Sequence, residues 1–220
     1  RCEWRGYKVQ VLSLEQDAGV ADLRSVDLLV GGGAQDRQQE IIMRDLCGAK
    51  AEMLREKIEL GTPGIFTCGA PQLLGHYYEP AVGQRIQGLG IFDFVSVHPG
   101  PAARRCIGNL VIRVTAARLA QELEVMTGFP PYLIGFENHG GRTRLGQVEP
   151  LGQVLQGLGN NGDDGTEGAF YRNAIATYSH GPILPKNPFL ADWLIQTALM
   201  QKYQIPLVLK PLDDQLSMQA

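Results

Sequence analysis

The stretch GIFTCGAPQLLG, residues 64–75, decides the fold. Its apolar first half predicts a buried strand that runs directly into a tight turn and then a helix. Cys68 lies at this turn, where free backbone N–H groups and the helix dipole favour a thiolate. Gly69 lets the backbone pass close to a reacting carbonyl, and its N–H is placed to help hold an oxyanion. Cys68 is therefore a candidate nucleophile. A packed structural cysteine is the alternative, because free cysteines are among the most buried residues.

The segments before this stretch alternate between strand and helix patterns. Strands are predicted at 7–12 and 26–30, and helices are predicted at 35–46 and 49–60. Such alternation favours a mostly parallel central sheet with helices on both faces and a ligand site outside the carboxyl ends of its strands. The triple glycine at 31–33 and Cys68 both follow such strand ends.

The second half of the chain is richer in turns. It carries predicted strands at 93–97, 106–114, 133–136 and 174–177, one strong helix pattern at 188–200, and a loop composition at 157–168. We expect one domain over residues 1–205, followed by a short tail at 206–220.

Composition narrows the class of protein. The 220 residues are 44% hydrophobic, enough for one substantial core, or at most two small ones, without metals or disulfides. A net charge of −3 and the lack of Lys/Arg runs disfavour nucleic-acid and anionic-lipid partners. No apolar stretch reaches the ~20 residues that span a bilayer, so we expect a soluble, cytoplasmic protein. The four cysteines are widely spaced, and neither a metal site nor a disulfide framework is predicted.

Histidine supplies the candidate base. His180 ends an apolar run over 174–180 and precedes a Gly-Pro turn, so it lies at a strand end, the same kind of location as Cys68. A histidine within hydrogen-bond reach would take the thiol proton and later deliver it to a leaving amine. A histidine that merely caps a strand is the alternative. His76 and His98 are expected to be ordinary surface or turn residues, which leaves His139 as the other candidate.

The triple glycine at 31–33 allows backbone N–H groups to face a ligand. It has neither of the glycine spacings of phosphate-binding loops, which makes the nucleotide interpretation weak. Completing an oxyanion hole and forming a plain turn both remain open.

Four phrases follow one another along the chain: GGGAQDRQ (31–38), Cys68 with QLLG (72–75), GFENHGGRT (135–143) and YSHGPILPKNP (178–188). In this order they resemble the class I glutamine amidotransferases of the cobyric-acid-synthase type. The match is closest to the GatD family, the glutaminase subunits of lipid II isoglutaminyl synthase. The resemblance implies a three-layer, flavodoxin-like α/β fold. Because that family begins with an upstream strand and loop, and RCEWRG (1–6) is typical of a closing helical turn, we expect the fold to be truncated at its N-terminus.

The resemblance also implies roles for individual residues. Cys68 would attack the carboxamide carbon of glutamine to form a glutamyl thioester and release ammonia, with His180 as acid and base. The N–H of Gly69 and an N–H of the glycine turn, at Gly32 or Gly33, would form the oxyanion hole. Arg105 matches the arginine that binds substrate glutamine, and the adjacent Arg104 leaves that assignment open by one position.

The sequence departs from the broader family at two positions. Pro71 replaces an aromatic residue in the nucleophile helix, where proline is tolerated in the first turn. Pro182 stands where many amidotransferases carry a glutamate, so a Cys-His dyad is expected, as in the GatD family. For Glu137, His139 and Arg142 a structural role is slightly favoured over a role in the site.

The implied function is supply of ammonia to a separate MurT-type ligase that amidates D-glutamate of the peptidoglycan stem. No metal or organic cofactor is expected here, because ATP and Mg²⁺ would belong to the ligase subunit. Two alternatives remain: the glutaminase part of a corrinoid amidase such as cobyric acid synthase, and a catalytically silent binding subunit that keeps the fold.

Overall fold

The central sheet of the protein has four strands. The computed structural model describes residues 1–13 and 19–214. The strand order is β1 (Leu29–Gly31), β2 (Gly64–Thr67), β12 (Ala174–Thr177) and β11 (Ala169–Tyr171). The first three run parallel and β11 is an antiparallel edge, so the predicted parallel sheet is confirmed for the strands around Cys68.

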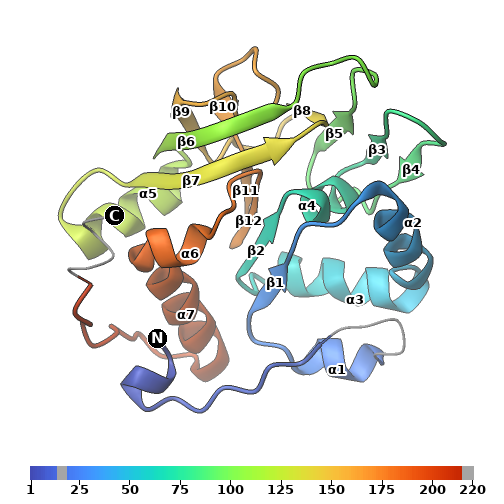
Figure 1. The fold of residues 1–220 in the computed structure, drawn as a ribbon. Helices are drawn as coiled ribbons and strands as arrows, with labels where there is room; N and C mark the ends of the chain where they lie inside the picture. The colour runs from blue at the N-terminus through green and yellow to red at the C-terminus, as the bar shows by residue number, and fades with distance from the viewer. Residues whose placement is uncertain (14–18, 215–220) are drawn as a thin grey trace.

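Helices cover both faces of this sheet (Figure 1). Ile65 of β2 belongs to a core cluster with α5 (Ala117–Thr127) and α7 (Pro188–Tyr203). The next residue, Phe66, points to the opposite face and packs in a cluster with α1 (Val20–Ser25) and α3 (Gly48–Glu59). This alternation follows from the period of two along a strand, and it confirms the predicted three-layer α/β fold.

Two further sheets were not foreseen from the sequence. One is antiparallel throughout and has the order β10 (Thr166–Glu167), β9 (Gly152–Gln156), β6 (Cys106–Val114) and β7 (Tyr132–His139). The other has the order β4 (Ile86–Gln87), β3 (Tyr77–Glu79), β5 (Phe94–Val97) and β8 (Arg142–Leu145), with only β3 and β5 parallel. The β6–β7 pair runs from Arg113 opposite Tyr132 to Cys106 opposite His139.

Some predicted elements differ in the structure. The predicted strand at 7–12 is wrong: these residues form no strand, and Val9 and Val11 are exposed. A strand needs a neighbour to satisfy its backbone groups, and none of the described residues pairs with this run. Helices α1, α5 and α6 (Ile183–Lys186) were missed, and the predicted loop at 157–168 contains the short strand β10.

The remaining helices agree closely with prediction. α2 (Asp36–Asp45) and α3 fall within two residues of the predicted 35–46 and 49–60, and α4 (Gly69–Leu74) follows Cys68. A 3-10 turn, Glu3–Arg5, closes on Gly6 in the left-handed region. Residues 206–214 contain no helix or strand, although Leu209 is buried and its N–H donates to Gln196 of α7.

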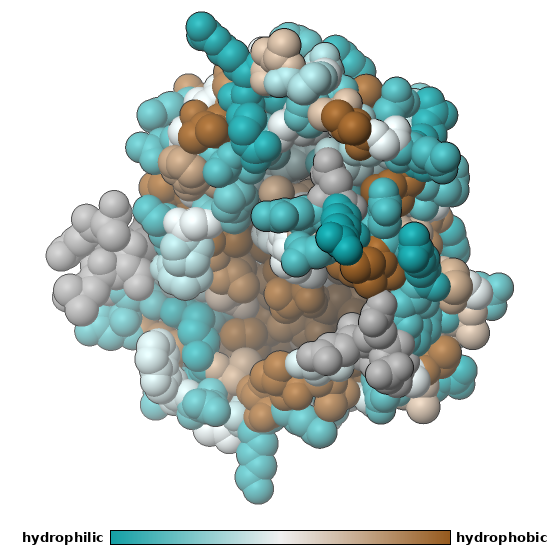
Figure 2. Space-filling model, turned by 45° about the vertical axis from the view of Figure 1, so that its right-hand side comes forward, coloured by the Kyte–Doolittle hydropathy of each residue, from teal (hydrophilic) through white to brown (hydrophobic). Residues whose placement is uncertain are grey.

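Apolar residues also reach the surface. Figure 2 shows a hollow lined by apolar residues on the face turned toward the viewer. Among the described residues, large apolar side chains that are exposed include Val30, Ile107, Tyr132 and Ile134. Within the described ranges, no helix is both long enough and apolar enough to cross a bilayer.

Candidate active site

Cys68 occupies a strained turn between β2 and α4. Its backbone has φ 56° and ψ −104°, a left-handed φ that non-glycine residues rarely adopt. Its N–H donates to the carbonyl of Thr177 at 2.9 Å, which anchors the turn to the neighbouring strand β12. Strain held in place by its surroundings is characteristic of functional turns, and a sharp strand-to-helix turn exposes a nucleophile above a sheet.

The Cys68 thiol is protonated in the free protein at neutral pH. Burial raises the pKa of Cys68 above its ordinary value of 9.0. The N–H of Gly69 and the positive charge of Arg105 favour the thiolate, but they do not outweigh burial. Attack by this sulfur therefore requires a base.

His180 lies at the same sheet edge as Cys68. β2 and β12 are adjacent and parallel with Thr67 opposite Thr177, so the residues that follow both strands leave the sheet on one side. His180 is fixed by two backbone hydrogen bonds to Phe136 of β7, at 2.8 and 2.9 Å. Its Nε2 is buried and has no hydrogen-bond partner within the described chain.

The His180 imidazole is neutral at neutral pH. Burial lowers the pKa of His180 below 6.5, and the positive charge of His139 lowers it further, while the Asn138 carbonyl acts in the opposite direction. A neutral imidazole at the same sheet edge as a protonated thiol has the protonation state that a general base needs.

The glycine turn after β1 packs directly on Cys68. A Cβ on Gly33 would lie 3.4 Å from the Cβ and 3.8 Å from the Sγ of Cys68. A Cβ on Gly69 would lie 2.5 Å from the carbonyl oxygen of Ala34, a distance that real Cβ atoms do not show. A Cβ on Gly32 would have no other atom within 4 Å. The glycine turn and helix α4 therefore pack so closely that only glycine fits at position 69.

Arg105 lies close enough to Cys68 for its charge to favour the thiolate. Its Nε donates to the side-chain oxygen of Asn138 at 3.0 Å, and its Nη2 donates to the Asn138 carbonyl at 3.1 Å. The carbonyl of Arg104 instead accepts a hydrogen bond from Arg142. Asn138, which sequence reasoning did not single out, thus contacts Arg105 and influences His180; its place in the FENHGG phrase was the available signal.

A chain of buried polar side chains runs beneath the site, and sequence reasoning missed it. Gln39 of α2 donates to Gln72 of α4 at 2.8 Å, and Gln72 donates to the hydroxyl of Tyr178 at 3.0 Å. The Tyr178 hydroxyl is 2.9 Å from that of Thr143, which is 2.7 Å from that of Ser96. These hydrogen bonds connect helix α4 to the segment that carries His180.

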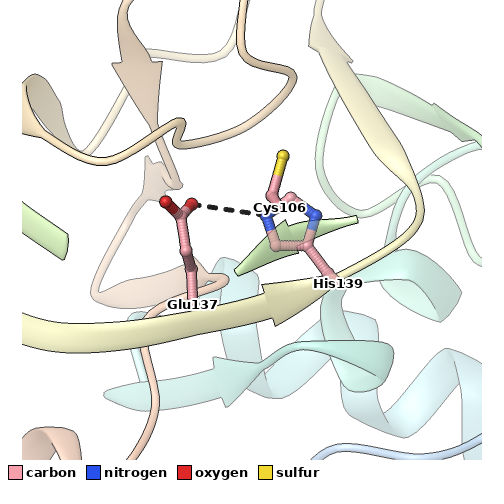
Figure 3. A group of neighbouring side chains, drawn as sticks. All are labelled: Cys106, Glu137 and His139. Atoms are coloured by element: carbon pink, nitrogen blue, oxygen red, sulfur yellow. Dashed lines mark ion pairs between the residues drawn. The ribbon is translucent and has the colours of Figure 1, made fainter. Parts of the chain in front are cut away.

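Cys106, Glu137 and His139 form a second buried cluster (Figure 3). One ligand atom from each lies within 4.8 Å of the others, and these are donor types that zinc takes. However, Glu137 already accepts the N–H groups of Leu158 and Gly159, at 2.6 and 2.9 Å, and its oxygen is 3.6 Å from Nε2 of His139. The Glu137 carboxylate therefore already has hydrogen-bond and ionic partners within the protein, and we interpret the cluster as a buried ion pair between Glu137 and His139.

His139 is a charged core residue. Burial opposes its charge, but Cys106, Glu137 and the Gly141 carbonyl outweigh burial and raise the pKa of His139 to about 9. Its ring stacks on Tyr178 with centroids 3.6 Å apart. It therefore supports the segment before His180 and supplies the positive charge that lowers the His180 pKa.

A three-layer α/β fold with a cysteine and a histidine at one edge of its parallel strands is the arrangement expected of α/β enzymes that act through a cysteine nucleophile. Residues 5–188 match the CobB/CobQ-like glutamine amidotransferase domain. The chain belongs to this family of glutamine amidotransferases, and within it to the GatD family.

Individual relatives agree with this assignment. The chain is 36% identical over 220 residues to the lipid II isoglutaminyl synthase (glutamine-hydrolyzing) subunit GatD of Staphylococcus aureus, covering 100% of this chain and 82% of that protein. It is 37% identical over 211 residues to the subunit of the same name from Streptococcus pneumoniae, covering 95% and 74%. A solved structure of a glutamine amidotransferase has the same fold, with a TM-score of 0.56 at 16% identity, covering 81% of this chain and 82% of that one.

Proposed function

We propose that this chain is the glutaminase subunit of a lipid II isoglutaminyl synthase. It hydrolyses L-glutamine through a thioester on Cys68 and supplies ammonia to a MurT-type ligase that amidates D-glutamate of the lipid II stem peptide. The observation that carries the proposal is the placement of Cys68 and His180 after two adjacent parallel strands. Identity of 36–37% to two proteins named as this subunit supports the choice of pathway.

The first half of the reaction forms the thioester. His180 takes the thiol proton as Cys68 attacks the carboxamide carbon of glutamine, whose oxygen becomes negatively charged. The N–H of Gly69 and an N–H of the turn at Gly32 or Gly33 stabilise this oxyanion, while Arg105 binds the substrate glutamine. Collapse of the tetrahedral intermediate breaks the C–N bond, and His180 donates its proton to the departing ammonia.

The second half releases glutamate. His180 takes a proton from water as the water oxygen attacks the thioester carbon, and the same N–H groups hold the second oxyanion. Breaking of the C–S bond returns the proton to Cys68 and frees glutamate. This chemistry needs no metal or organic cofactor on this chain, and ATP and Mg²⁺ belong to the ligase subunit in a cytoplasmic complex.

A sheet face next to the site, which carries several exposed apolar residues beside Arg113 and Asn138, supports the proposal of a partner subunit. Val111 and Ile134 are cross-strand neighbours on β6 and β7, and Ile107 and Tyr132 lie on the same face of these strands. Ile107, Tyr132 and Ile134 are about half exposed. Phe136 continues this face and pairs with His180. A ligase subunit that covers this face would lie beside the site and shield the path of ammonia.

The test is glutamate release from glutamine by the chain co-expressed with a MurT-type ligase. Cys68→Ala and His180→Ala should each abolish release, and Arg105→Ala should raise KM. If the wild-type complex releases no glutamate in the presence of ATP and lipid II, the glutaminase proposal fails and a silent binding subunit becomes the better interpretation.

A further inference from the structure

Gln39 is a buried polar residue with no assigned role in the reaction. It lies on α2, is only 1% exposed, and directs its side-chain amide toward the glycine turn and the nucleophile helix. Its Nε2 donates to the carbonyl of Ala34 at 3.1 Å and to Oε1 of Gln72 at 2.8 Å. One amide group therefore joins the turn that follows β1 to the helix that follows Cys68.

The orientation of this amide is determined by its partners. The Ala34 carbonyl can only accept, so the NH₂ group of Gln39 must face it. That choice places the oxygen of Gln72 toward Gln39 and the nitrogen of Gln72 toward the Tyr178 hydroxyl. The orientation of the Gln39 amide therefore sets the orientation of the Gln72 amide on α4. Gln72 in turn donates to Tyr178, two residues before His180.

The turn itself needs an external support of this kind. Its three glycines carry no side chain, and glycine peptides rotate more freely than others. One end is held by Thr67, whose hydroxyl donates to the Gly31 carbonyl at 3.3 Å. The other end is held at Ala34 by Gln39, whose Nε2 would lie only 2.9 Å from a Cβ on Gly69.

We propose that Gln39 is a positioning residue for the oxyanion hole. By holding the Ala34 carbonyl, it keeps the peptide units of the turn at 31–34 oriented so that a backbone N–H faces the carbonyl oxygen of the substrate. The inference rests on the proposed glutaminase reaction. Because both tetrahedral intermediates use this hole, loss of Gln39 slows thioester formation and thioester hydrolysis alike.

The test compares Gln39→Met with wild type in the complex with the ligase. Methionine keeps the length and volume of glutamine but cannot donate to Ala34. The expected result is a kcat for glutamate release that falls about 10- to 100-fold, with KM within about threefold of wild type, because one oxyanion donor is misplaced. Glu40→Met is the matched control, since Glu40 is the next residue on the same helix and is exposed, and it should leave kcat unchanged.

Alkylation of Cys68 by iodoacetamide separates positioning from a general structural role. This reagent reacts at a tetrahedral carbon and forms no oxyanion, so its rate should be unchanged in Gln39→Met. An equal fall in alkylation and kcat, a rise in KM without a fall in kcat, or wild-type kcat would each overturn the inference. If Gln39→Met and Gln39→Leu both fail to fold, Gln39 serves the fold and the inference is also wrong.

The inference can fail separately from the proposed function. Absence of glutamate release by the wild-type complex contradicts the glutaminase proposal. A crystal structure of Gln39→Met tests the positioning role independently of turnover: a rotated Ala34 carbonyl supports it, and an unmoved one overturns it.

Discussion

Gly69 and Ala34 lie so close that a Cβ on Gly69 would be 2.5 Å from the Ala34 carbonyl oxygen and 2.7 Å from its nitrogen. Both contacts are with backbone, which cannot move aside as a flexible side chain can. Gly69→Ala should therefore displace the glycine turn, reduce glutamate release by at least about 100-fold and destabilise the protein by about 1–3 kcal/mol.

Gly19→Ala provides the control for Gly69→Ala. Gly19 has φ −77°, and its Cβ would be 3.6 Å from the nearest atom, so alanine fits there without strain. Kinetics and thermal denaturation of both variants check the prediction, and normal turnover in Gly69→Ala would contradict it.

The strain at Cys68 should be measurable as stability. A non-glycine residue held at φ 56° costs about 1–3 kcal/mol, and glycine adopts that conformation freely. Cys68→Gly should therefore be at least as stable as Cys68→Ala. At ordinary positions in a helix or strand, a protein with glycine is about 0.5–1 kcal/mol less stable than the same protein with alanine. Denaturant unfolding of the two inactive variants measures the difference in their free energies of unfolding. A Cys68→Ala variant more stable than Cys68→Gly would argue against strain at this turn.

The pH dependence of activity follows from the charge on His180. The reaction needs neutral His180, so activity falls as pH decreases through its pKa. Because burial and the His139 charge lower the pKa of His180, the acid limb of kcat/KM should lie below pH 6.5. His139→Gln removes the positive charge and should move that limb to higher pH. A wild-type limb at or above pH 6.5, or one that does not move in the variant, would contradict this assignment.

Stability should change in a different pH window. The pKa of His139 is raised from 6.5 to about 9 in the folded protein, so folding favours its protonated form. This stabilisation is fully present below pH 6.5 and is lost as pH rises through 9. The free energy of unfolding should therefore decrease from pH 6.5 to 9, and His139→Gln should lack this part of the decrease while being less stable overall, because Glu137 loses its partner.

The sequence was most informative where local patterns and chain order determine the structure. The run at 64–67 followed by Cys68 and Gly69 predicted a strand, turn and helix, because the apolar run and the glycine act within a few residues. The strand at 7–12 failed because pairing depends on a neighbour that local pattern does not show. Helix α5 was missed although Leu119 and Leu123 have the spacing of one helical face.

The buried partners of the site were beyond local reasoning. Gln39, Gln72 and Tyr178 are separated by 33 and 106 residues, and each is an ordinary polar residue in its own segment. Only the packing of α2 on α4, and of α4 on the sheet that contains β12, brings them into one hydrogen-bond chain. Residue type and position at strand ends indicated the candidate reactive groups, whereas their supports depend on tertiary contacts.

The exposed face of β6 and β7 provides a prediction about assembly. Ile134 is 46% exposed, and its backbone N–H donates to Asn187, so its side chain can be changed without disturbing the strand. Ile134→Glu places a charge among the apolar residues of this face and should weaken binding to the ligase subunit by at least about tenfold, since the partner would have to desolvate that charge. Val125→Glu, at an 81% exposed position on α5, is the matched control and should bind normally. Affinity measured by calorimetry for both variants, with thermal denaturation to verify folding, decides the matter: equal affinity of Ile134→Glu and wild type would place the partner on another face.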